Sequence, residues 1–387
     1  MISARGTVIG AITVALILSG CTPNPTTTDP APSSLSPVPD SSTAPASTPG
    51  ASPPRASPAG TPSASPAGTA SPGTPTDFVT DLTTPWGMVQ MTDGSVLVSE
   101  RDTAMIKKVT RGRTVEVGRV PGVAARGEGG LLGLALSADE RTLFVHLSTG
   151  DDNRIVSYGF DGTSIGTEKV LLDGIPVSGN HNGGQLIMGP DGFLYASTGD
   201  ASVRQDAQDK RSLAGKILRL TIEGKPAPGN PYGNEVFSYG HRNVQGLAFD
   251  DDGRLWASEF GDQTFDELNL ITAGGNYGWP AIEGDASTID GMINPERVWA
   301  TSDNSPSGLA FAAGSLWMGG LRGERLWQIP LSGERTGDPV ATVTDRGRLR
   351  GVLAYQDGIL VATSNTDGRG EAADGDDRLL MIKLERA

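Results

Sequence analysis

Cysteine, histidine and aromatic residues are scarce in this chain of 387 residues. It has one cysteine and three histidines, and aromatic side chains make up 5% of it. A single cysteine excludes a disulfide framework within the chain and a zinc site built on cysteines. The net charge of −14 argues against nucleic-acid binding, because a phosphate backbone attracts a surface rich in Lys and Arg.

Proline and small polar residues dominate the segment 22–76. Its only charged residues are Asp29, Asp40 and Arg55. Such a composition buries too little apolar surface to offset the entropy of the chain. The segment is therefore predicted to be a disordered Pro/Ser/Thr-rich tether in front of a folded domain that spans residues 77–387.

The N-terminal residues 1–21 read as a signal peptide. An apolar run follows Arg5, and it is too short for a dedicated membrane span. The run ends in Leu18-Ser19-Gly20-Cys21, which resembles the lipobox of bacterial lipoproteins; an ordinary signal peptide with a chance cysteine is the alternative. We expect Cys21 to carry lipid, so that the protein is anchored to the cell membrane on its extracytoplasmic face.

A short theme recurs six times after residue 77. An apolar strand runs into Asp-Gly or a similar turn, and a second apolar strand follows. The turns lie at positions 93, 139, 191, 252, 313 and 357. Hairpin repeats of roughly 40–60 residues are typical of a β-propeller with four strands in each blade. The sequence predicts an all-β fold, a six-bladed propeller, and regular spacing disfavours a pair of β-sandwiches.

Polar residues gather where the chain enters the predicted inner strands. His181 and His241 both lie in such runs, whereas His146 lies within a strand and is expected to be structural. Arginines occur at equivalent points, at positions 126, 322, 348 and 350. Equivalent positions of a propeller converge on one face, and arginines in one pocket need an anion to neutralise them. The pattern favours a polyanionic ligand, with surface salt bridges as the alternative.

Several runs together resemble the glucose/sorbosone dehydrogenase family, the soluble quinoprotein sugar dehydrogenases, over about residues 78–384. The most specific runs are Gly240-His241-Arg242-Asn243-Val244-Gln245-Gly246 and Gly275-Asn276-Tyr277-Gly278-Trp279-Pro280. The resemblance implies oxidation of aldose sugars at C1 with pyrroloquinoline quinone (PQQ) and calcium as cofactors. The partners it implies are a sugar substrate and, through Cys21, the membrane.

The resemblance also assigns roles to individual residues. His181 resembles the base, Asp200 the carboxylate that orients it, and Arg242 the cation that stabilises charge on the quinone oxygen. The positions that resemble cofactor contacts are Glu128, Asn243, Arg322, Arg348 and Arg350. Calcium is expected on the backbone carbonyls of Gly261 and Asp262.

Two departures from the family pattern keep a second function open. Phe260 and Asp262 stand where the family often has Gln or His and Pro, and a bulky Phe260 would crowd or stack on the cofactor. The alternative function is a non-catalytic propeller lipoprotein that binds carbohydrate or a protein partner at the cell envelope. Hydrolysis lacks a visible nucleophile or a set of metal-binding histidines.

Overall fold

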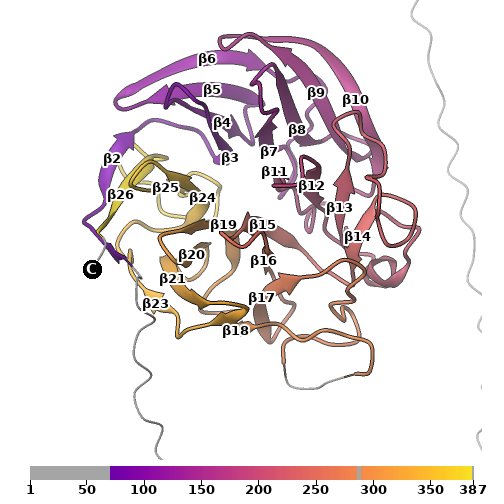
Figure 1. Cartoon of the computed structure of the whole chain (residues 1–387). Helices are drawn as coiled ribbons and strands as arrows, with labels where there is room; N and C mark the ends of the chain where they lie inside the picture. Colours follow the sequence, from indigo (N-terminus) through magenta and orange to yellow (C-terminus); the bar gives the residue numbers. More distant parts are fainter. Residues whose placement is uncertain (1–69, 286–288, 386–387) are drawn as a thin grey trace, which may run out of the picture. The chain divides into compact units, whose positions relative to one another are not determined.

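Six β-sheets surround one axis in the computed structural model, which describes residues 70–285 and 289–385 (Figure 1). The inner strands contact one another around a closed ring, and the last inner strand contacts the first. The prediction of an all-β, six-bladed propeller is confirmed. The predicted signal peptide with Cys21 and the tether up to residue 69 lie outside the described residues.

The blades follow one another along the chain, each from its inner to its outer strand. The first blade holds β3 (Pro85–Gln90), β4 (Val96–Glu100), β5 (Met105–Thr110) and β6 (Arg113–Arg119). The second holds β7 (Leu131–Leu136), β8 (Thr142–Ser148), β9 (Asn153–Phe160) and β10 (Ile165–Ile175). The third holds β11 (Leu186–Met188), β12 (Leu194–Ser197), β13 (Lys216–Leu220) and β14 (Val236–Tyr239), with the 3-10 helix η1 (Arg204–Gln208) between β12 and β13.

The remaining three blades complete the ring. The fourth holds β15 (Val244–Phe249), β16 (Leu255–Glu259), β17 (Phe265–Ile271) and β18 (Arg297–Ala300). The fifth holds β19 (Pro306–Ala312), β20 (Ser315–Gly320) and β21 (Arg325–Ser332), whose edge pairs with the short strands β22 (Arg335–Thr336) and β23 (Val340–Ala341). The sixth holds β24 (Leu349–Tyr355), β25 (Gly358–Thr363) and β26 (Leu379–Glu385).

The sixth blade is completed by the N-terminal end of the described chain. Strands β1 (Ser71–Pro72) and β2 (Thr76–Val79) both pair with β26, and Ala70 is buried where its carbonyl accepts a hydrogen bond from Gln328 Nε2 at 2.8 Å. The predicted boundary between tether and propeller at residue 76 is therefore wrong. Residues 70–76 belong to the propeller, because without them the outer edge of β26 would present unpaired backbone groups.

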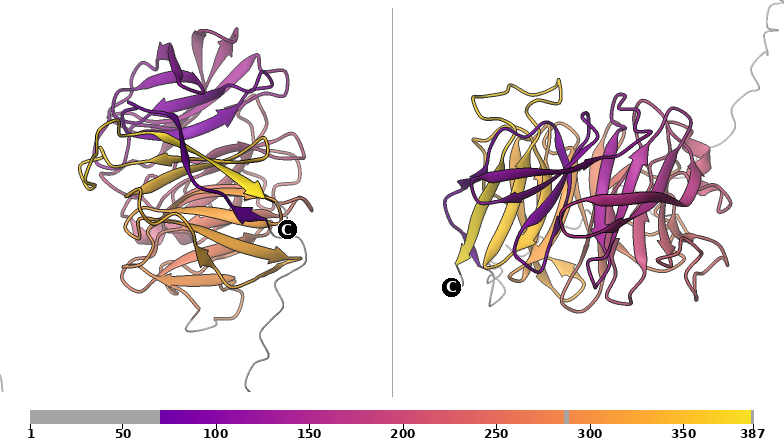
Figure 2. Two further views of the ribbon diagram at one scale, coloured as in Figure 1. Left: turned by 90° about the vertical axis from the view of Figure 1, so that its left-hand side faces the viewer. Right: turned by 90° about the horizontal axis from the view of Figure 1, so that it is seen from above.

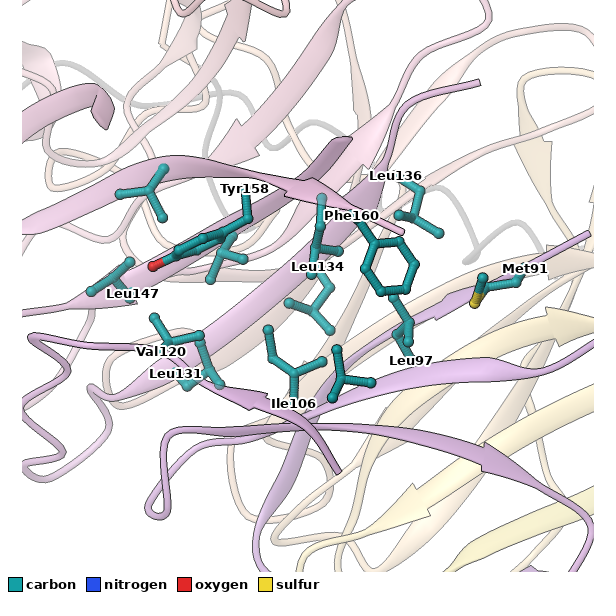
Figure 3. Packing of buried hydrophobic residues seen from close by; sticks show 14 residues of the cluster. Met91, Leu97, Ile106, Val120, Leu131, Leu134, Leu136, Leu147, Tyr158 and Phe160 are labelled. Atoms are coloured by element: carbon teal, nitrogen blue, oxygen red, sulfur yellow. The ribbon is translucent and has the colours of Figure 1, made fainter. Parts of the chain in front are cut away.

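Apolar cores lie between every pair of neighbouring blades, which is why the inner strands are apolar on both faces. Figure 3 shows the core between the first two blades, where Leu97 and Ile106 pack against Leu134 and Phe160. Each fully buried side chain of this kind contributes about 1.5–3 kcal/mol to stability. These cores fix the positions of the strand ends from which the loops arise.

Glycines in the repeated theme let the inner strands approach the axis. A Cβ on Gly133 would lie 2.4 Å from the carbonyl oxygen of Gly184 in the next blade, and one on Gly308 would lie 2.6 Å from that of Arg350. Side chains at these positions would push neighbouring blades apart. The small residue that leads most copies of the theme is therefore a requirement of packing. Among the described residues, no helix has the length and apolar character needed to cross a membrane.

Candidate functional site

One face of the propeller carries the residues predicted to form the site. In each blade the chain crosses this face between the second and third strands and again on its way to the next blade. The long loop between β25 and β26 rises from this face (Figure 2, right, in yellow). The predicted residues in or beside these loops are Glu128, His181, Asp200, Arg242, Asn243, Gly261, Asp262, Arg322, Arg348 and Arg350.

His181 and Asp200 form a hydrogen-bonded pair across two loops of the third blade. The imidazole Nδ1 lies 2.8 Å from Asp200 Oδ1, and the histidine side chain is 14% exposed while the aspartate side chain is fully buried. An ionised carboxylate beside Nδ1 selects the tautomer with its proton on that nitrogen. The other nitrogen, Nε2, then carries a lone pair, and the side-chain Nδ2 of Asn180 lies 3.4 Å from it. An imidazole held in this tautomer has the arrangement of a general base.

The buried carboxylate of Asp200 accepts further hydrogen bonds from two other groups. Its Oδ2 accepts from the indole Nε1 of Trp279 at 2.8 Å, and its Oδ1 also accepts from the backbone N–H of Ser202 at 2.8 Å. Burial disfavours the charged form, but the hydrogen bonds from His181 and Trp279 outweigh it and hold the pKa of Asp200 below its ordinary value. The carboxylate is therefore ionised at neutral pH.

Arg242 lies beside this pair and is held by the loop after β16. Its Nη2 donates to Asp262 Oδ1 at 3.1 Å, and its Nη1 donates to the carbonyl of Phe260 at 3.4 Å. The other oxygen of Asp262 accepts from Arg204 Nη2 at 2.9 Å. The carboxylate of Asp262 thus pairs with two arginines, whereas the sequence placed this residue only at a calcium site. The Nε of Arg242 is buried and has no hydrogen-bond partner among the described residues.

Glu283 organises the loop that carries Gly261 and Asp262. Its Oε1 accepts the backbone N–H groups of four consecutive residues, 262 to 265, at 2.8–3.0 Å. Burial opposes ionisation, but these four donors hold the pKa of Glu283 below its ordinary value. Asp266 accepts from the N–H of Gly261 at 2.9 Å, and burial raises the pKa of Asp266 to about 6.

This loop leaves two oxygen atoms available. In the described parts of the chain, no hydrogen bond ends on the carbonyl of Gly261 or of Asp262. Carbonyl oxygens of this kind are ligands that calcium accepts. The same described residues contain no group of three or more His, Cys, Asp or Glu side chains able to hold a metal ion.

Arg348 and Arg350 come together at the opposite side of the site, close to the propeller axis. Both are buried, and Asp367 Oδ2 lies 3.1 Å from Arg348 Nη2 and 3.6 Å from Arg350 Nη2. Burial, with the charges of Arg101 and Arg348 nearby, lowers the pKa of Arg350 to about 10 even though Asp367 opposes the shift. Arg101 is paired with Asp102 at 2.7 Å, so Arg348 and Arg350 share the one buried carboxylate of Asp367. The pair of arginines therefore leaves an excess of positive charge, which favours an anionic ligand.

The other predicted residues take different positions. Glu128 links two loops, because its Oε2 accepts from the backbone N–H of His181 at 3.0 Å and its Oε1 from Arg369 at 3.3 Å. Asn243 is buried, and its Oδ1 accepts from the N–H of Gly183 at 3.0 Å, so this amide supports the loop of His181. Arg322 is exposed, and its Nη1 reaches the carbonyl of Thr301 at 3.5 Å.

The other two histidines are structural. His241 is fully buried, with Nδ1 2.9 Å from Glu259 Oε2, Nε2 2.8 Å from Ser238 Oγ, and its ring stacked on Tyr277. The second carboxylate oxygen of Glu259 accepts the N–H of Arg242 and so fixes the backbone of that arginine. His146 is also fully buried, and burial lowers its pKa to about 4, so it stays neutral as expected for a strand position.

The sequence did not reveal the partners that hold these site residues. Contacts with predicted site residues are made by Trp279, Arg204, Glu283 and Asp367, none of which the sequence singled out as a site residue. Trp279 lies in the run GNYGWP, which carries the resemblance to the family but does not by itself indicate a contact with Asp200.

Comparisons with known proteins identify the family of this chain. Residues 82–379 match the family model for glucose / sorbosone dehydrogenase. A solved structure of the PQQ-bound form of the aldose sugar dehydrogenase from Streptomyces coelicolor is 49% identical, covers 83% of this chain and 100% of its own, and superposes with a TM-score of 0.80.

Two further proteins are similar to this chain in sequence. The aldose sugar dehydrogenase YliI of Escherichia coli is 29% identical over 327 residues, which is 73% of this chain and 88% of the relative. The quinoprotein glucose dehydrogenase B of Acinetobacter calcoaceticus is 32% identical over 248 residues, covering 53% of this chain and 52% of the relative. With the family model matching most of its length, this chain belongs to the glucose/sorbosone dehydrogenase family.

Proposed function

We propose that this protein is an aldose dehydrogenase that oxidises sugars at C1 and uses PQQ and calcium as cofactors. The observation that carries the proposal is the pair formed by His181 and the buried Asp200, whose Nδ1–Oδ1 distance is 2.8 Å. The PQQ-bound relative from Streptomyces coelicolor supports the choice of cofactor. When bound, PQQ supplies a hydride acceptor and calcium a Lewis acid.

The base in this reaction is His181. Its Nε2 takes the proton of the sugar C1 hydroxyl, and a neutral imidazole is suited to this step near neutral pH. Asp200 stabilises the imidazolium that forms, because its buried charge lies against Nδ1. The histidine side chain is partly exposed, so it returns the proton to solvent after each turnover.

The cationic side chains of the site fit a cofactor with several carboxylates. Arg348 and Arg350 together carry more positive charge than Asp367 neutralises, and the pKa of Arg350 is already lowered to about 10. Bidentate contact with carboxylates is the chemistry to which arginine is suited. Arg242 would face charge that develops on the quinone oxygen. Its buried Nε has no hydrogen-bond partner in the part of the chain that the structure describes, so this donor is available.

Backbone oxygens of the loop after β16 would hold calcium. The carbonyls of Gly261 and Asp262 accept no hydrogen bond from the described residues, whereas the Asp262 carboxylate is occupied by Arg204 and Arg242. The protein would therefore supply carbonyl ligands, and water and the cofactor would complete the shell.

The proposal is tested with the purified protein, PQQ, calcium and a panel of aldoses. We expect aldose-dependent dye reduction that needs both cofactors. His181→Ala should slow it by about two to four orders of magnitude, whereas His146→Gln, a change at a histidine remote from the site, should leave it largely intact. Absence of PQQ binding in an absorbance titration with calcium present would contradict the proposal. That result would favour the non-catalytic carbohydrate- or protein-binding lipoprotein.

We also propose that the enzyme is anchored by lipid on Cys21 to the extracytoplasmic face of the cell membrane. The support for this is the sequence Leu18-Ser19-Gly20-Cys21 at the end of an apolar run. Cys21→Ser is expected to release the protein from membranes or leave the signal peptide uncleaved. Fractionation measures the partitioning and mass spectrometry the processing, and no change in either would refute the lipid anchor.

A further inference from the structure

We propose that Trp279 is a positioning residue that fixes the carboxylate of Asp200 and thereby sets the basicity of His181. The proposal rests on the assignment of His181 as the base. Trp279 itself touches neither ring nitrogen of His181 in any of the hydrogen bonds among the described residues. Its effect would therefore pass through Asp200.

The two oxygens of Asp200 have separate partners. Oδ1 accepts from His181 and from the N–H of Ser202, and Oδ2 accepts from the indole of Trp279. Because Asp200 is fully buried, water does not replace a missing donor. The indole thus locks the carboxylate in one orientation and keeps its second oxygen from competing for the proton on Nδ1.

Trp279 is itself held firmly in place. Its carbonyl accepts from Gln208 Nε2 at 2.7 Å, and Gln208 ends the helix η1. The buried Lys216 donates its ammonium group to the carbonyls of Asp206 and Ala207 in this helix, at 2.8 and 3.0 Å. A fixed indole holds the carboxylate more closely than a mobile donor such as water would.

The same indole contacts the arginine side of the site. The guanidinium carbons of Arg204 and Arg242 lie 5.0 and 5.3 Å from the ring centroid, within the range of cation–π attraction. Both arginines also pair with Asp262. One side chain therefore fixes the orienting carboxylate with its N–H and supports the proposed charge-stabilising arginine with its ring.

The charged groups around His181 determine how loss of the indole N–H would change the pKa of this histidine. Asp200 faces its ring, and Glu128 accepts its backbone N–H while also pairing with Arg369. Arg204 and Arg242 lie beyond the indole. In Trp279→Phe the Asp200 carboxylate keeps its charge but loses one donor, so it interacts more strongly with an imidazolium at His181. We expect the pKa of His181 to rise by about half a unit to one unit.

The test measures this pKa by NMR in the cofactor-free, full-length protein. The chain has only three histidines, and two of them are fully buried, so the titrating imidazole resonance is readily assigned. The matched control is Trp256→Phe, because the Trp256 indole also donates to a carboxylate, that of Asp250 at 2.9 Å. Trp256 lies near the start of β16, beside a hairpin turn away from the site. The control is expected to leave the His181 titration unchanged.

A His181 pKa in folded Trp279→Phe that equals the wild-type value, or that falls below it, would overturn the proposal. If this variant does not fold, the wild-type protein provides a second test. The indole N–H resonance of Trp279 should titrate with the same midpoint as His181, and a resonance that does not change with pH would equally overturn it. Neither measurement needs PQQ, so failure to bind PQQ would contradict the proposed function without affecting this result.

In the holoenzyme the same change has a kinetic signature. Trp279→Phe is expected to move the acid limb of the kcat–pH profile upward by the same amount as the NMR pKa, with KM for the sugar changed less than kcat. A uniform loss of activity at every pH, without a shift of the limb, would indicate a merely structural role.

Discussion

Replacing Asp200 with asparagine removes the charge of the buried carboxylate with little change in its shape. The carboxylate accepts from three donors, on His181, Ser202 and Trp279, each at 2.8 Å. An asparagine offers one oxygen and one amino group. If the oxygen remains with His181, the amino group meets the indole N–H, and one buried donor is left unpaired at a cost of about 1–3 kcal/mol in stability.

The other orientation of the asparagine is equally unfavourable for catalysis. Its amino group would donate to His181 Nδ1 and select the tautomer that carries a proton on Nε2, which is then unable to accept the proton of the sugar. The first orientation removes the negative charge beside the imidazole, and the second removes the lone pair on Nε2. In either case we expect kcat to fall by about two to four orders of magnitude, or about 3–5 kcal/mol in the barrier. Affinity for PQQ should change little, because Asp200 is fully buried.

Steady-state dye reduction and an absorbance titration with PQQ separate these two effects. The matched control is Asp250→Asn, since Asp250 also accepts from an indole N–H, that of Trp256, but in a remote hairpin turn. The control should lose stability without a comparable loss of kcat. If Asp200→Asn kept kcat within about fivefold of wild type, or lost PQQ binding as severely as turnover, the assignment of the pair as base and orienter would be refuted.

Three further changes test other parts of the structure. Burial, with the nearby charge of Glu259, raises the pKa of Glu267 from 4.5 to about 8, so the folded protein holds a proton that the unfolded chain releases, and stability is lost as pH rises between these values. In urea titrations, Glu267→Gln should therefore raise the free energy of unfolding by about 1–4 kcal/mol more at pH 8 than at pH 5. An equal effect of the substitution at both pH values would contradict this prediction. Arg350→Ala should weaken PQQ binding about ten- to a hundredfold through loss of a charge-assisted contact, whereas Arg254→Ala should not, and equal affinities in an absorbance titration would count against the arginine site. Deletion of residues 70–75 should lower the thermal midpoint by about 2–6 °C, because β26 loses β1 and Gln328 loses the carbonyl of Ala70, and an unchanged midpoint in calorimetry would place these residues outside the fold.

The six blades could be predicted from the sequence because each inner hairpin is a local structure. The turn near Asp93, for example, joins β3 and β4 within a few residues, and the apolar runs on either side pair directly across it. Repetition of such units then indicates the propeller, since a single blade does not bury both of its faces alone.

Closure of the ring could not be predicted in the same way. Strand β1 is two residues long and contains a proline, and it pairs with the other end of the chain. Its Ser, Thr and Pro composition matches that of the segment before it, so local sequence gives no sign of a boundary at residue 70. The segment pairs with β26 because the outer edge of β26 would otherwise present unpaired backbone groups.

Most contacts between the predicted site residues and their partners could not be predicted from the sequence. The family resemblance predicted the contact between His181 and Asp200, which the structure shows at 2.8 Å. It gave no sign that Trp279 reaches Asp200 across 79 positions of the chain, or that Arg369 reaches Glu128 across 241. The backbone carbonyl of Asp262 was expected to bind calcium, but the ion pairs of its carboxylate with Arg204 and Arg242 were not foreseen. Which charges neutralise one another depends on how the loops of different blades meet, and that is set by the closed ring.

A titration of the purified protein with PQQ, with calcium present, followed by addition of an aldose, tests the central claim most directly. The account predicts saturable binding with one PQQ per chain, then a change of the PQQ spectrum to that of its reduced form when the sugar is added. In His181→Ala the binding should persist and the reduction should slow by about two to four orders of magnitude. A wild-type protein that binds no PQQ, or a His181→Ala variant that reduces it as fast as wild type, would contradict the account.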